Sequence, residues 1–177
     1  MSMFLDITSI EGESRSQVAA WDKKIDQQTM SYDVSQRTSL EVGSGLIAGG
    51  AVFAPMSIRK TMDKSTPLLW AKLCAGEPID MVIIRISRPG ATKQAITGGL
   101  FEAENYAMKN VIVTSYHTSG LPGLGGLPTE DWLFSFTSIV EQYRTVDAQG
   151  NLQPVQPAGW DIGANMPAVG GPSMAQS

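Results

Sequence analysis

The chain has 177 residues, of which 42% are hydrophobic and 17% charged, with a formal net charge of -4. This length suits one domain with a hydrophobic core of its own. The acidic balance argues against a nucleic-acid binder, because phosphate binding depends on clustered lysines and arginines. The single cysteine, Cys74, excludes an internal disulfide, and no segment approaches the roughly 20 apolar residues of a membrane helix.

The first elements in chain order are two strands. Residues 4–8 are rich in β-forming side chains and lead into an acidic turn at residues 11–14. Residues 25–35 alternate imperfectly, which predicts a strand with one wet side. The polar face of this strand carries Thr29, Ser31 and Asp33. The opposite face carries Met30, Tyr32 and Val34.

An apolar, glycine-rich arm follows at residues 36–50. Its four glycines make it too flexible for a core element, yet it is too apolar for an ordinary linker. We therefore expect the arm to dock on another surface. Residues 52–62 return to a strand-like pattern, interrupted by Pro55, which a central paired position would not tolerate.

One helix is predicted from residue 65 or 66 to residue 75. A hydroxyl residue precedes it, Pro67 lies in its first turn, and Gly76 follows its last turn. Leu69 and Leu73 are four residues apart, and Trp70 lies beside them. This spacing predicts an apolar stripe that packs against a sheet.

Three long strands are predicted in the second half, at residues 79–87, 106–119 and 132–145, with a hairpin-like turn at residues 147–150. They indicate a mostly antiparallel sheet or barrel. Residues 1–169 are predicted to form one domain. Residues 170–177, rich in glycine and serine, are predicted to be a disordered tail.

The residues that usually carry enzyme chemistry are sparse. His117 is the only histidine and lies in mid-strand, whereas a catalytic base also needs a nucleophile and an orienting partner. Zinc sites draw mainly on several Cys and His ligands. Cys74 lies at the carboxyl end of the predicted helix, where the helix dipole disfavours a thiolate. We therefore predict no catalytic residue, no metal and no cofactor.

Short motifs follow one another along the chain in a distinctive order. They are Phe4-Leu5-Asp6-Ile7, Ile10-Glu11-Gly12-Glu13-Ser14, Lys60-Thr61-Met62-Asp63-Lys64-Ser65-Thr66-Pro67-Leu68-Leu69, Cys74-Ala75-Gly76, Val111-Ile112-Val113-Thr114-Ser115-Tyr116, Asp147-Ala148-Gln149-Gly150 and Gly159-Trp160-Asp161. Each is only a cap, a turn or a strand. Their common order resembles the Hcp family, the tube proteins of the type VI secretion system, from residue 4 to about residue 169.

The resemblance implies a mainly β (α+β) fold, a compact barrel of two antiparallel β-sheets flanked by one α-helix. It implies a structural protein that forms homo-hexameric rings, which stack into a hollow tube. A contractile sheath would push the tube out together with spike proteins, and the lumen would shelter effector cargo proteins. The chain would assemble in the cytoplasm and be secreted without a signal peptide, with no membrane insertion.

The resemblance also suggests roles for two groups of residues. The arm would make contacts between protomers or between stacked rings, although a mobile loop is the alternative. The arm residues are Leu40, Val42, Gly43, Leu46, Ile47 and Gly49. Thr29, Ser31 and Asp33 are the candidate lumen face. The turn at residues 11–14 is either an interface turn or an ordinary surface turn.

Two other functions compete with the tube protein. The first is a small β-barrel module that binds carbohydrate or peptide, with Trp132, Tyr143 and Trp160 as stacking residues. The second is a cell-wall hydrolase that uses His117. An annular particle would favour the tube protein, a glycan signal lost in Trp→Ala variants would favour the module, and a hydrolytic activity lost without His117 would favour the enzyme.

Overall fold

The structure is a computed structural model that describes residues 1–16, 21–41, 43, 45–90, 100–120, 126–168 and 170–174. These residues form β-strands and one helix. In chain order the elements are β1 (Ser2–Ile7), β2 (Ile25–Ser31), β3 (Val34–Glu41), β4 (Gly45–Phe53), β5 (Met56–Thr61), α1 (Thr66–Ala75), β6 (Ile79–Pro89), β7 (Leu100–Ser119), β8 (Thr129–Ser135), β9 (Ser138–Tyr143), β10 (Gln156–Asp161) and β11 (Met166–Pro167).

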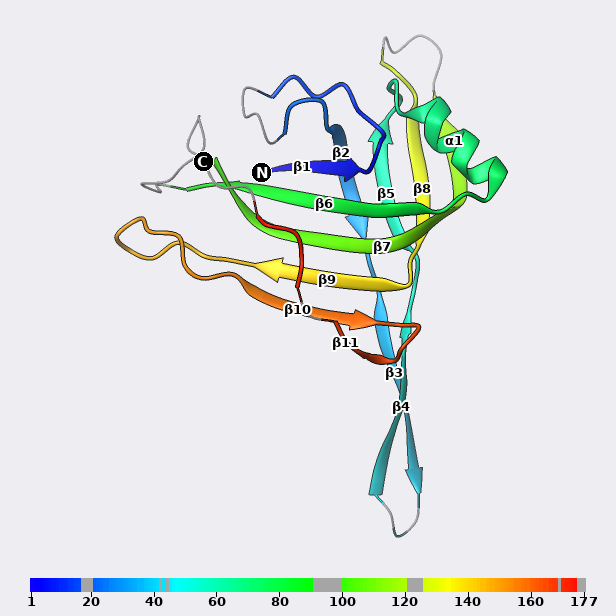
Figure 1. Cartoon of the computed structure of the whole chain (residues 1–177), viewed down its shortest axis with the longest axis vertical. Coiled ribbons are helices and arrows are strands. Elements are labelled where there is room, and N and C mark those ends of the chain that lie inside the picture. Colours follow the sequence, from blue (N-terminus) through cyan, green and yellow to red (C-terminus); the bar gives the residue numbers. More distant parts are fainter. Residues whose placement is uncertain are drawn as a thin grey trace.

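The sheet closes on itself into a barrel. The hydrogen-bonded order runs β7-β6-β1-β2-β5-β8 and returns to β7, with every pairing antiparallel. The long strand β7 pairs with β6 and β9 along its first half and with β8 along its second half. It therefore closes the barrel and also carries the β9-β10-β11 extension (Figure 1).

The barrel encloses the main hydrophobic core. Alternate side chains of each strand point inward, as a period of two residues requires. The core includes the fully buried Leu5, Ile25, Met56, Val82, Ile84, Met108, Val111, Trp132 and Phe134. The predicted fold class, a mainly β barrel flanked by one helix, is confirmed.

Helix α1 has the predicted bounds but not the predicted stripe. Gly76 ends it in a left-handed conformation with φ 64°, which glycine adopts without steric cost. Leu69 is buried and Leu73 packs against the core, whereas Trp70 is 52% exposed. The expectation for Trp70 was wrong, because only a narrow stripe of the helix touches the barrel, on the side of β7.

The single strand predicted at residues 132–145 is two strands. β8 pairs with β5 and with the second half of β7, whereas β9 pairs with the first half of β7. The chain must therefore turn between them, and the Thr137 amide donates to the Lys109 carbonyl there at 3.1 Å. Local alternation continues through this turn, so the sequence did not reveal it.

Two other segments are more ordered than the sequence indicated. The arm forms an antiparallel hairpin, β3–β4, that projects from one end of the barrel (Figure 1). Residues 156–161 form β10 beside β9, and residues 166–167 form β11 beside β10. Within the predicted tail, Met174 is buried with 5% of its surface exposed, so packing continues past residue 169. Residues 175–177 lie outside the described residues.

Candidate assembly surface

The outer face of four neighbouring strands forms a polar surface, which we call the polar wall. Thr29 of β2 lies opposite Arg59 of β5, Arg59 opposite Asp131 of β8, and Asp131 opposite His117 of β7. The neighbours of Arg59 and Asp131 along their strands are buried, so these two side chains point outward. Thr29 and His117 pair with them in register and therefore lie on the same face. The polar wall consists of Thr29, Ser31, Ser57, Arg59, Thr61, Ser115, His117, Ser119, Thr129, Asp131 and Ser135. Two apolar side chains share this face: the half-buried Leu133, opposite Ser57 and Ser115, and the exposed Ile112, opposite Ser135.

The predicted lumen residues lie mainly on this surface. Thr29 and Ser31 are exposed members of the polar wall. Asp33 lies past the end of β2, where its carbonyl oxygen accepts a hydrogen bond from the Ala54 amide at 3.0 Å. Asp33 therefore belongs to the base of the hairpin. The predicted apolar face of β2 also ends early, because Val34 is 45% exposed.

The two oppositely charged side chains of the polar wall, Arg59 and Asp131, form an ion pair. The Arg59 guanidinium donates to both carboxylate oxygens of Asp131, at 2.7 and 3.0 Å. This hydrogen bonding holds the pKa of Asp131 below its ordinary value and raises the pKa of Arg59. His117, the candidate base of the hydrolase hypothesis, lies exposed beside an acid that Arg59 already engages. The remaining wall side chains are mostly hydroxyls.

The β3–β4 hairpin exposes its apolar side chains. Leu40 and Leu46 lie directly opposite each other and are 80% and 72% exposed, and Ile47 is 40% exposed. Gly43 adopts a φ of 91°, which suits glycine at the tip. Gly49 lies close to Arg37, since an added Cβ would meet the Arg37 carbonyl oxygen at 3.2 Å. Val42 lies outside the described residues.

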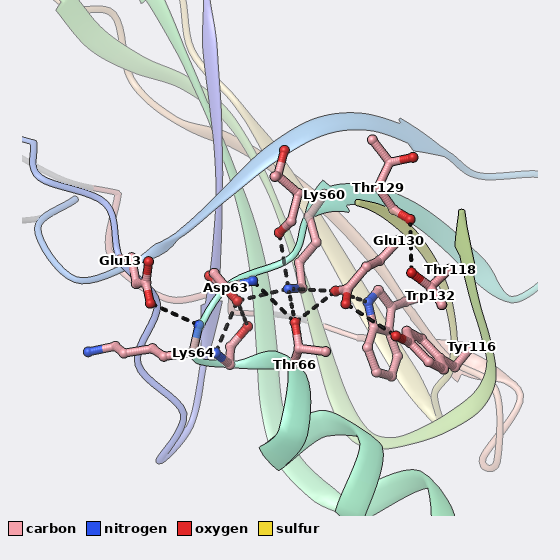
Figure 2. A network of polar contacts seen from close by, with 12 residues as sticks. Glu13, Lys60, Asp63, Lys64, Thr66, Tyr116, Thr118, Thr129, Glu130 and Trp132 are labelled. Atoms are coloured by element: carbon pink, nitrogen blue, oxygen red, sulfur yellow. Dashed lines mark hydrogen bonds and ion pairs between the residues drawn. The ribbon is translucent and has the colours of Figure 1, made fainter. Parts of the chain in front are cut away.

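A buried ion network fastens the segment between β5 and α1 (Figure 2). Lys60 and Glu130 are both 0% exposed, and the Lys60 ammonium lies 2.8 Å from a Glu130 carboxylate oxygen. The ammonium also lies 2.8 Å from an Asp63 carboxylate oxygen and donates to the Thr66 hydroxyl at 2.9 Å. Buried charges require such partners, because their desolvation is costly.

Glu130 completes this network from the side of the barrel. It accepts hydrogen bonds from Thr66 Oγ1 at 2.9 Å, Trp132 Nε1 at 3.2 Å and the Tyr116 hydroxyl at 3.3 Å. The network thereby joins β5, β7, β8 and the start of α1 (Figure 2). The sequence patterns did not predict this network. The available signal was that Lys60 and Glu130 occupy core-facing positions in the alternation of their strands.

The acidic turn at residues 11–14 is held against the same segment. Glu13 accepts a hydrogen bond from the Lys64 amide at 3.0 Å, and the Lys64 ammonium lies 3.4 Å from Glu11. The Gly12 amide donates to the Lys23 carbonyl at 2.7 Å. These contacts hold the turn against the segment between β5 and α1 and against residue 23. Its role as an interface turn stays a prediction.

A known protein family matches most of this chain. The family model described as "Type VI secretion system effector, Hcp" matches residues 4–143, which include the polar wall, the hairpin and the ion network. The chain belongs to the Hcp family. No curated protein matches this Hcp-family chain.

Solved structures share its fold. A structure described as a type six secretion system protein superposes with a TM-score of 0.82 at 22% identity, covering 94% of this chain and 99% of the other. Hcp1 from Salmonella typhimurium gives 0.71 at 21% identity, covering 94% and 98%. A type VI secretion system effector from Yersinia pestis gives 0.66 at 23% identity, covering 90% and 99%.

The three aromatic residues of the binding-module hypothesis do not form one site in this Hcp-family chain. Trp132 is 0% exposed inside the barrel and cannot stack on a ligand. Tyr143 is on β9 with the Arg88 guanidinium 5.9 Å from its ring centre, and Trp160 is on β10, paired in register with Ile139. The hypothesis therefore loses its central residue.

Neither a metal-binding cluster nor a membrane-spanning helix is present in the described part of the chain. No group of three or more His, Cys, Asp or Glu side chains there is arranged to hold a metal ion. No helix there is long and apolar enough to cross a membrane.

Proposed function

We propose that this Hcp-family chain is the structural subunit of the type VI secretion inner tube. Six copies close into a ring, and the rings stack into a hollow tube that is secreted with effector cargo inside. Family membership over residues 4–143 is the observation that carries this proposal. The contractile sheath and the spike proteins are its partners, and assembly in the cytoplasm precedes export without a signal peptide.

The polar wall is suited to line the lumen of such a tube. It spans β2, β5, β8 and the second half of β7, and Thr29 and Ser31 lie on it. Hydroxyl side chains keep a surface hydrated, and the bidentate Arg59–Asp131 pair leaves little net charge there. A wall of this chemistry attracts cargo of neither sign strongly, so cargo can pass along it.

The β3–β4 hairpin is suited to join copies. It is a two-stranded sheet whose outer edges are unpaired among the described residues, and β4 carries no charged residue. Unpaired, uncharged strand edges are templates for association with another chain. Together with the exposed Leu40 and Leu46, this makes the arm the first choice for contacts between protomers or rings.

Negative-stain microscopy and native mass measurement of the purified full chain test the proposal. We expect annular particles with the mass of six subunits, because a closed ring uses identical contacts at every junction. Single subunits at every concentration, without annular particles, would refute it. In cells, we expect release into the medium only when the secretion machine is active, and release from cells lacking the sheath would contradict the proposed route.

A further inference from the structure

One outward-facing surface of the barrel is buried within the single chain. Ile84 of β6, Met108 of β7 and Ile139 of β9 belong to the barrel core, so the next residues along these strands point to the opposite face. These residues lie side by side in register, and each is at most 8% exposed. We call this surface the back face, and it consists of Ile83, Asn105, Ala107, Val140 and Gln142.

The chain after β11 supplies part of the cover of the back face, and we call residues 168 and 170–174 the strap. The Ala168 amide donates to the Gly159 carbonyl of β10 at 3.0 Å. A Cβ added at Gly171 would lie 2.6 Å from the side-chain amide carbon of Gln142, so the strap packs directly against the back face. Met174 is buried at the end of the strap. Figure 1 shows the strap, in red, running from β11 across β10 and β9.

The strap is held by few polar contacts. The bond from Ala168 to Gly159 is the one hydrogen bond between the strap and the other described residues. The strap carries no charged side chain, and Pro172 has no amide hydrogen to donate. Segments with few hydrogen bonds open at a small part of the free energy of global unfolding. The strap can therefore leave the sheet without breaking an ion pair.

The strap covers the back face without satisfying its polar groups. Asn105 and Gln142 lie opposite each other across β7 and β9. Their side-chain oxygens, Asn105 Oδ1 and Gln142 Oε1, are buried and have no hydrogen-bond partner among the described residues. A buried oxygen without a donor typically costs about 1–3 kcal/mol. A partner that brings N–H donors to both oxygens would therefore bind the back face better than the strap does.

The charges favour a second copy of this chain as that partner. Each copy carries a net charge of -4, so two copies repel each other unless they meet through surfaces without excess charge. No member of the back face is charged, and the neighbouring Arg85 and Glu102 form an ion pair at 3.0 Å. The back face lies on β6, β7 and β9, whereas the polar wall also uses β2, β5 and β8. A ring can therefore bury the back face and leave the polar wall in water.

We propose that the strap is a displaceable cover that keeps the back face closed in the single subunit, and that a neighbouring copy in the ring replaces it. This inference rests on the proposed ring and adds a step to its formation. The strap leaves first, and N–H donors of the neighbour then reach Asn105 and Gln142. The strap thereby raises the subunit concentration that ring closure needs, because the strap and the neighbour compete for one surface.

A disulfide that locks the strap tests this step in the full chain. Gln142→Cys with Gly171→Cys, made in a Cys74→Ser background, places two thiols at positions that are already in contact. By native mass measurement, the oxidised protein should need at least a 10-fold higher concentration to form six-subunit rings than the same sample after reduction. The matched control is Gln142→Cys alone in the same background, and reduction should leave its ring formation unchanged.

A bulky side chain in the strap tests the opposite direction. Gly171→Leu would overlap Gln142 and should form rings at a concentration at least threefold lower than the unmodified chain needs. The control is Gly163→Leu, where an added Cβ meets only Asp161 Oδ1 at 3.5 Å, and it should change nothing. Ring formation that ignores the locked disulfide, or that Gly171→Leu leaves equal or weaker, would overturn the assignment of the strap. Single subunits of the unmodified chain at every concentration would instead overturn the proposed function.

Discussion

Replacing Lys60 by methionine should destabilise the fold strongly at neutral pH. Methionine nearly fills the space of the lysine stem, so the main loss is the ammonium. That group lies 2.8 Å from Glu130, 2.8 Å from Asp63 and 2.9 Å from Thr66. Glu130 would remain 0% exposed with only neutral donors around it. Removing one member of a buried ion pair typically costs about 3–5 kcal/mol.

Protonation limits this cost and makes it depend on pH. A buried glutamic acid without its cation can bind a proton, at about 1.36 kcal/mol for each pH unit above the reference pKa of about 4.3. Protonation therefore limits the stability lost in Lys60→Met to roughly 3.7 kcal/mol at pH 7 and to about 1 kcal/mol at pH 5. The variant should lose folding stability as the pH rises, because this acid is harder to ionise in the folded state than in the unfolded state. Lys60→Met should therefore be much less harmful at pH 5.

Urea unfolding followed by tryptophan fluorescence measures this effect. Protein concentration must be held constant, since assembly contributes to apparent stability. The double variant Lys60→Met with Glu130→Gln should be more stable at pH 7 than Lys60→Met alone, because it removes the carboxylate at position 130 that Lys60→Met leaves buried without its cation. A loss below about 1 kcal/mol at pH 7, or equal losses at both pH values, would refute the reasoning.

Two further predictions concern a carboxylate pair and a close backbone approach. Burial and the neighbouring Glu104 carboxylate raise the pKa of Glu141 above 4.5, so Glu141→Gln should increase stability at pH 7 by roughly 0.2–1 kcal/mol. The gain should vanish below pH 4.5, where the unfolded acid is also protonated, and an equal gain in thermal scans at pH 7 and pH 4 would count against this cause. A Cβ at Gly12 would lie 2.3 Å from the Lys24 carbonyl oxygen, so Gly12→Ala should lower the free energy of unfolding by about 1–3 kcal/mol. Gly50→Ala, which meets nothing within 4 Å, is its control, and equal urea midpoints would show that the backbone near Gly12 yields.

The parts of the fold that were predicted correctly depend on neighbours close in the sequence. Pro67 and Gly76 mark the ends of α1, because each acts on the backbone of its own helix turn. The alternation at residues 79–87 and 106–119 identified β6 and most of β7. The polar alternation of residues 29–33 likewise indicated an exposed strand face, and Thr29 and Ser31 are on it.

The candidate site was predicted less completely. Leu40 and Leu46 were selected as arm residues, but their pairing across a hairpin depends on the register of β3 and β4. Cross-strand register is set by the whole ribbon and not by either segment alone. A groove lined by residues 8–10, by one side of α1 and by residues 77–80 could not be anticipated from any one of these segments.

The sequence by itself determined the class of the protein: an acidic, mainly β chain with one helix marked by Pro67 and Gly76 and with the ordered motifs of the Hcp family. These properties follow from composition and from interactions within a few residues. Only the tertiary structure decided that β7 is shared between the barrel and its extension, and that Lys60 is buried against Glu130. Both depend on contacts between residues distant in the chain, and a buried charge is tolerated only where the closed fold brings its partner within hydrogen-bonding distance.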